Sequence, residues 1–156
     1  MRNKQKGFSL IELLIVVAII LIIAAIAIPN LLRSKMAANE ASAVGSLRTI
    51  NTASVEYATT YGGYPPALTN LSPATPATST SSDLIDSVLA AGLKSGYAFT
   101  YAAVTSDANG NILSYTIVAN PSTRGTTGQR GFFTNQTGVI RADATTAATA
   151  TSTPIS

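Results

Sequence analysis

The feature that most constrains this chain is an apolar run near its beginning. From Leu13 to Ile28, sixteen consecutive residues carry no polar side chain. As a helix they extend about 24 Å, and the longer stretch from Phe8 to Ile28 extends about 31 Å, close to the thickness of the hydrocarbon core of a bilayer. Such a helix has no polar face to present to water. The sequence therefore predicts a membrane-spanning helix over residues 8–29.

One acidic residue, Glu12, lies inside this stretch. A carboxylate in lipid costs several kcal/mol unless it is neutralised or paired. Either Glu12 stays hydrated at the depth of the lipid headgroups, or it pairs with a cation at its own depth. No Lys or Arg lies between Phe8 and Pro29. A free amine on Phe8 would supply the cation, and that requires the removal of residues 1–7.

The first seven residues, MRNKQKG, carry positive charges at Arg2, Lys4 and Lys6 and no negative ones. Positive charge before an apolar segment keeps that end of the chain in the cytoplasm. A conventional secretory signal has a similar pattern, and the Ala-Ile-Ala at 25–27 offers a small-x-small cleavage site for it. The acid at Glu12 speaks against that alternative.

The string from Lys6 to Leu14, KGFSLIELL, resembles the class III signal of type IV pilins and of the related pseudopilins of type II secretion. The resemblance extends over residues 6–32 and includes Pro29 and Asn30. It implies an α+β fold in which a long N-terminal helix packs against a small antiparallel sheet. It also implies a bacterial inner-membrane protein, with its N-terminus in the cytoplasm, that later becomes part of a cell-surface pilus.

The resemblance assigns roles to four residues. It implies that a prepilin peptidase cuts between Gly7 and Phe8, and that the new terminal nitrogen of Phe8 is methylated. Glu12 would bind the amine of Phe8 in a neighbouring subunit, and Pro29 would also serve assembly. The implied partners are the peptidase, an inner-membrane assembly machinery, membrane lipid before assembly, and further copies of the chain in a filament.

Residues 31–61 have a different character from the apolar run. Their apolar residues recur at three, four or seven positions and the charged residues mostly take other faces, which predicts an amphipathic helix. The apolar stripe is expected to seat a sheet, and a coiled-coil seam is the weaker alternative because Ala and Ser interrupt it. Pro29 either kinks one continuous helix over 8–61 or begins a second helix. The helix formers that follow favour the kinked helix, and the Gly/Tyr/Pro turn at 62–66 ends it.

The remaining chain is long enough for one small domain. We expect a globular head over 62–143, which begins with a loop and contains a short helix at 83–91 with Ser82 as its N-cap. An antiparallel sheet is predicted within 97–142. The low-complexity residues 144–156 are predicted to be disordered. Four strands are expected from alternation and turn signals: 97–105, 112–119, 132–133 and 139–140.

Two groups of polar residues in the head invite a metal or catalytic interpretation. Asp83 and Asp86 lie together, but at the start of a helix carboxylates serve the helix dipole. Asp107, Asn109 and Asn111 alternate like calcium ligands. The glycine of that loop is misplaced and the bidentate Glu is missing, so a plain hairpin turn is the favoured interpretation. We therefore predict no metal site and no cofactor.

The composition narrows the function further. The chain has no cysteine and no histidine, which removes disulfides, thiolate and imidazole catalysis, and zinc sites built on them. Three of its ten basic residues lie in the first seven positions, which leaves seven basic and seven acidic residues in the rest. There is no basic patch with interleaved aromatic residues, so nothing indicates nucleic-acid binding.

Three functions remain open on the sequence. The first is a structural subunit of a type IV pilus, and no enzyme. The second is a major pseudopilin of a type II secretion system, although the calcium loop expected near its C-terminus is not found. The third is a secreted or membrane-anchored enzyme or binding domain, against which stands the absence of a nucleophile–base constellation.

Overall fold

The structure is a computed structural model that describes residues 8–155. It contains two compact units, which divide between Lys35 and Met36 and are described separately here. Helix α1 (Leu10–Tyr61) contributes to both units and contains Pro29. The elements after α1 are η1 (Leu68–Leu71), α2 (Ser87–Ala90), β1 (Leu93–Lys94), β2 (Tyr97–Ser106), β3 (Ile112–Pro121), β4 (Gly131–Asn135), β5 (Arg141–Asp143) and β6 (Thr153–Pro154).

The first unit is the apolar part of α1. Its side chains from Phe8 to Leu32 are exposed apart from the half-buried Ala24. This part of the helix is long and apolar enough to cross a membrane. The chain thus presents a continuous apolar surface on all sides of a helix, which is stable only in lipid or against other apolar surfaces.

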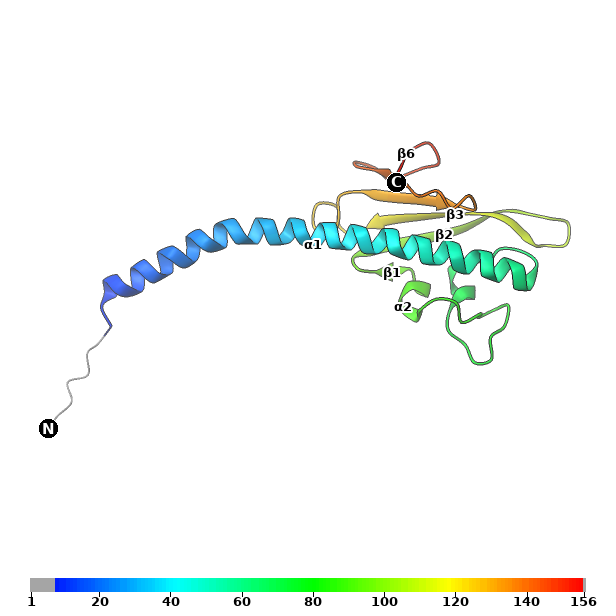
Figure 1. Cartoon of the computed structure of the whole chain (residues 1–156), viewed down its shortest axis with the longest axis horizontal. Helices are drawn as coiled ribbons and strands as arrows, with labels where there is room; N and C mark the ends of the chain where they lie inside the picture. Colours follow the sequence, from blue (N-terminus) through cyan, green and yellow to red (C-terminus); the bar gives the residue numbers. More distant parts are fainter. Residues whose placement is uncertain (1–7, 156) are drawn as a thin grey trace. The chain divides into compact units, whose positions relative to one another are not determined.

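The second unit is a six-stranded antiparallel sheet packed against the later part of α1 (Figure 1). The strands follow one another in the order β1-β2-β3-β4-β5-β6, so each pairs with its neighbour in sequence. This arrangement confirms the predicted α+β fold. The expectation of four strands was wrong: β1, β5 and β6 flank the predicted strands, and 139–140 lie just before β5.

The core lies between α1 and one face of the sheet. Along β3 the side chains of Tyr115, Ile117 and Ala119 are buried and alternate with half-buried ones, as a strand with one covered face requires. Leu47 and Ile50 of α1 are fully buried against this face. The predicted apolar stripe therefore seats the sheet. The other helix residues in this core are Ala43, Ala53 and Tyr57.

The predicted helix at 83–91 is shorter in the structure, where α2 has four residues. Asp83 adopts a left-handed backbone conformation with φ of 57°, which no helix can continue through. The N-cap is Asp86, whose Oδ1 accepts a hydrogen bond from the Leu89 amide at 2.9 Å. Ser82 is buried and donates its hydroxyl to the Asn70 carbonyl instead.

The C-terminal segment differs most from expectation. Residues 144–155 were predicted to be disordered, yet they follow a defined path and form β6, which pairs with β5. Arg124 Nη2 donates to the Thr146 carbonyl at 2.9 Å, and Arg141 Nη1 donates to the Ser152 carbonyl at 2.9 Å. A Cβ at Gly131 of β4 would meet the Thr146 carbonyl oxygen at 2.8 Å. Residues 146–148 of the segment therefore lie over Gly131, and two arginine side chains bind the segment through its backbone carbonyls, which composition does not reveal.

Candidate functional site

The candidate assembly site lies at the beginning of α1. Phe8 is 80% exposed, and Glu12 lies in the first turn of the helix. One carboxylate oxygen of Glu12, Oε2, accepts a hydrogen bond from the backbone amide of Ser9 at 2.9 Å. Pro29 lies inside α1, and Gly7 lies outside the described residues. The structure thus places two of the four predicted site residues, Glu12 and Pro29, on α1, and Phe8 two residues before its start.

The predicted ion pair joins Glu12 to the Phe8 amine of a neighbouring copy after cleavage, and it stays a prediction for a single unprocessed chain. The nitrogen of Phe8 is part of the peptide bond to Gly7, so it carries no charge until that bond is cut. Glu12 is paired instead with the Ser9 amide of its own chain. A neighbour's terminal amine would therefore meet a carboxylate that already has one partner.

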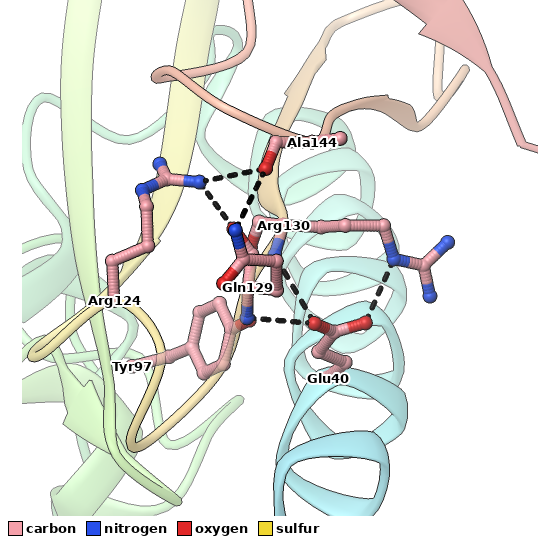
Figure 2. Close-up of polar contacts among 6 residues, drawn as sticks. All are labelled: Glu40, Tyr97, Arg124, Gln129, Arg130 and Ala144. Atoms are coloured by element: carbon pink, nitrogen blue, oxygen red, sulfur yellow. Dashed lines mark hydrogen bonds and ion pairs between the residues drawn. The ribbon is translucent and has the colours of Figure 1, made fainter. Parts of the chain in front are cut away.

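A second polar site, in the head, joins α1 to the loop between β3 and β4 (Figure 2). Glu40 of α1 accepts hydrogen bonds from the backbone amides of Gln129 and Arg130 at 2.8 and 3.1 Å. Arg130 Nε adds an ion pair with the second carboxylate oxygen at 2.7 Å. The buried Tyr97 hydroxyl donates to the Arg130 carbonyl, and Arg124 contacts the carbonyls of Gln129 and Ala144. One carboxylate thus anchors a loop whose other side holds the C-terminal segment.

The charge of Glu40 is stabilised where it lies. Burial alone raises the pKa of this carboxyl. The amide of Gln129 and the side chain and amide of Arg130 outweigh that effect and hold the pKa below its usual value. Burial raises the pKa of Tyr97 to about 12, and the Glu40 charge raises it too, so this phenol stays neutral and donates.

We expect Glu40→Gln to lower the free energy of unfolding by about 1–3 kcal/mol near neutral pH, because a neutral amide accepts these hydrogen bonds more weakly. A depressed pKa stabilises the fold above the unfolded-state pKa, and this contribution is lost as pH falls through the folded-state value. The difference between wild type and variant should therefore shrink below about pH 4. Urea unfolding of the full chain in micelles, followed by tyrosine circular dichroism, measures it.

The matched control for this prediction is Glu56→Gln, which removes an exposed acid from the same helix. Its effect on stability should stay within about 0.5 kcal/mol. A difference between wild type and Glu40→Gln that stays constant from pH 7 to pH 3 would contradict the role of the Glu40 charge.

A third polar group is buried between the helix and the sheet. The amide nitrogen of Asn51 donates to Thr134 Oγ1 at 2.9 Å, and the Tyr115 hydroxyl donates to Asn51 Oδ1 at 3.0 Å. Thr134 and Tyr115 are at most 1% exposed, and Asn51 is 9% exposed. This network, Asn51–Thr134–Tyr115, links α1 to β4 and β3 and satisfies polar atoms that have no access to water.

The two acidic groups of the head that invited a chemical interpretation have structural partners. Asp107 Oδ1 accepts from the amides of Asn109 and Asn111, both at 2.8 Å, which makes a plain hairpin turn. Asp86 caps α2 and forms an ion pair with Lys94 at 2.8 Å. Among residues 8–155, no three His, Cys, Asp or Glu side chains gather as metal ligands.

Sequence reasoning missed three of these contacts. The spacing Ser9-x-x-Glu12 is the pattern of a capping box and would have indicated the Ser9 contact. The polar Asn51 interrupts an apolar stripe, which hinted at a buried partner. Glu40 and Arg130 are 90 residues apart, and no local signal joins them.

Comparison with known proteins supports the interpretation of the N-terminal segment. Residues 2–28 match the family described as the prokaryotic N-terminal methylation motif. Over 40 residues the chain is 65% identical to the type IV wide pilus major component PilA4 of Thermus thermophilus. Over 50 residues it is 48% identical to the type IV major pilin protein PilA of Myxococcus xanthus.

These alignments are partial. They cover 26% and 32% of this chain, and only 30% and 23% of the respective relatives. The similarity therefore concerns a short segment, while the head is characterised by its own structure. The N-terminal segment thus carries the prokaryotic N-terminal methylation motif and is similar to the corresponding segments of two type IV pilins, and the rest of the chain adds a long helix packed on an antiparallel sheet.

Proposed function

We propose that this chain is a structural subunit of a type IV pilus. It enters the inner membrane as a prepilin, with residues 1–7 on the cytoplasmic side. A prepilin peptidase cuts between Gly7 and Phe8, and the nitrogen of Phe8 is methylated. The subunit then leaves the membrane through an assembly machinery and joins a helical fibre on the cell surface.

The observation that carries this proposal is the exposed apolar surface of α1. Large apolar side chains from Phe8 to Leu32 are between 46% and 80% exposed in the single chain. Such a helix can leave lipid only for another apolar environment. Many copies bundled side by side provide that environment, which supports a fibre with these helices at its centre.

Glu12 supports a defined register in such a bundle. Within residues 8–29 it is the only acid, and the positive partner available after cleavage is the terminal amine of Phe8. A carboxylate in an apolar bundle is stable when it is paired and hydrogen-bonded. Each subunit would therefore be favoured at the position where Glu12 meets the Phe8 amine of a neighbour. Pro29, which leaves one carbonyl of α1 without its helical donor, gives the helix a point of adjustment during assembly.

The head supports a structural role over an enzymatic one. The carboxylates of Glu40, Asp86, Asp107 and Asp143 each accept hydrogen bonds within the head. These side chains stabilise turns, a helix end and a loop. The names of the two relatives, both major components of type IV pili, favour a pilus over a secretion system.

The N-terminus of the mature protein tests the proposal. Mass spectrometry of chains from sheared surface fibres should identify a terminal peptide that begins with N-methylated Phe8. A chain that still begins at Met1, or one that begins near Ile28, would contradict processing by a prepilin peptidase. Deletion of the gene should remove surface fibres, whereas a secretion defect with fibres retained would favour the pseudopilin alternative.

A further inference from the structure

The first turn of α1 contains an internal partner for the assembly carboxylate. Helix α1 begins at Leu10, and its first helical hydrogen bond runs from the Leu13 amide to the Ser9 carbonyl at 3.2 Å. Ser9 is therefore the N-cap residue, and Glu12 lies three positions further on. The Ser9 amide donates to Glu12 Oε2 at 2.9 Å, which is one half of a capping box.

This contact gives a hydrogen-bond partner to two polar groups whose transfer into the membrane would otherwise cost free energy. The first amides of a helix have no partner within the helix, and an amide without a partner in lipid costs several kcal/mol. A carboxylate without a partner in lipid is also costly. Its position near the positive end of the helix dipole lowers that cost. Glu12 and the Ser9 amide therefore stabilise each other before any second subunit arrives.

The contact also determines where the carboxylate points. To reach the Ser9 amide, the side chain of Glu12 folds back toward the beginning of its helix. Ser9 directly follows Phe8, the residue that carries the terminal amine after cleavage. A carboxylate offers about four lone-pair positions on its two oxygens, so one amide leaves room for an ammonium group.

We infer that the backbone amide of Ser9 positions Glu12 for its intersubunit partner, holding one oxygen while the other binds the terminal amine of a neighbouring copy. This inference rests on the proposed fibre function. Ser9 is a positioning residue, and its contribution comes from the main chain. The hydroxyl of Ser9 is not required, so the residue tolerates any side chain that leaves the N–H in place.

Amide hydrogen exchange tests the contact directly. The probe is the processed full chain in phospholipid nanodiscs, with the exchange rate of the Ser9 amide measured by NMR. Glu12→Ala should speed this exchange about tenfold or more, while Glu12→Gln, which keeps an acceptor oxygen, should change it by less than about threefold. The Leu13 amide, whose partner is a backbone carbonyl, serves as internal control. A Ser9 rate that Glu12→Ala leaves unchanged would overturn the inference.

Assembly provides the second readout. Ser9→Ala keeps the amide and should yield surface fibres within about twofold of wild type, whereas Ser9→Pro removes the donor and should reduce them about tenfold or more. Fibres at wild-type yield from Ser9→Pro would overturn the inference. If the peptidase does not process that variant, the exchange measurement decides. The two failures are distinguishable: an unprotected Ser9 amide with normal fibres overturns only this inference, whereas a wild-type chain that forms no fibres overturns the pilus function on which the inference rests.

Discussion

Replacement of Glu12 by leucine should abolish surface fibres while leaving membrane insertion intact. Leucine removes a charge whose insertion costs about 2.5–3.5 kcal/mol at the centre of a membrane helix, so insertion becomes easier. The amine of Phe8 then enters the apolar bundle without a partner. An unpaired buried charge costs about 3–5 kcal/mol, which lowers the equilibrium constant for adding each subunit about a hundredfold or more. Immunoblots of the membrane fraction and of sheared fibres measure the two steps.

A neighbouring apolar exchange, Leu13→Val, is the matched control for Glu12→Leu. It alters the same turn of α1 without touching a charge, and it should yield both inserted protein and fibres. Fibres at wild-type yield from Glu12→Leu would contradict the pairing of Glu12 with a terminal amine. Loss of the protein from the membrane fraction would contradict the claim that Glu12 acts after insertion.

Local pattern was sufficient for the parts of the fold that depend on neighbouring residues. The apolar run and the stripe after it predicted a helix that the structure places at Leu10–Tyr61. The hairpin between β2 and β3 followed from alternation and from the Asn109-Gly110 pair, where Gly110 takes a φ of 86°. The roles predicted for Phe8 and Glu12 came from the resemblance of the N-terminal motif to the pilin signal, and the structure places Glu12 in the first turn of α1.

The predictions that failed concerned parts of the structure that depend on contacts between residues far apart in the sequence. Residues 144–155 are poor in large apolar side chains, and composition therefore indicated disorder. What orders them is a set of carbonyls bound by Arg124 and Arg141, together with pairing between β5 and β6. The same limit applies to Glu40, whose amide partners lie 89 and 90 residues further along the chain. Only the folded head reveals the structural role of Glu40.

The buried network Asn51–Thr134–Tyr115 gives the largest expected effect on stability in the head. Asn51→Ala should lower the free energy of unfolding by about 2–4 kcal/mol, because it leaves two hydroxyls without partners and opens a small cavity. Both hydroxyls are shielded from water, so water cannot replace the amide without entering the core. Urea unfolding of the full chain in micelles, followed by tyrosine circular dichroism, measures the loss.

The cause of that loss can be isolated by removing all three polar partners together. Replacing Asn51 with leucine, Thr134 with valine and Tyr115 with phenylalanine leaves an apolar interface of similar shape. This triple variant should recover at least about half of the stability lost in Asn51→Ala, because none of the three network positions then carries an unpaired polar group. Thr52→Ala, at an exposed neighbouring position of α1, should change stability by less than about 0.5 kcal/mol.

A triple variant less stable than Asn51→Ala would show that the network stabilises through its shape and not through its hydrogen bonds. If Asn51→Ala were as stable as wild type, neither the shape nor the hydrogen bonds of the network would contribute to stability, and apolar packing alone would hold α1 on the sheet.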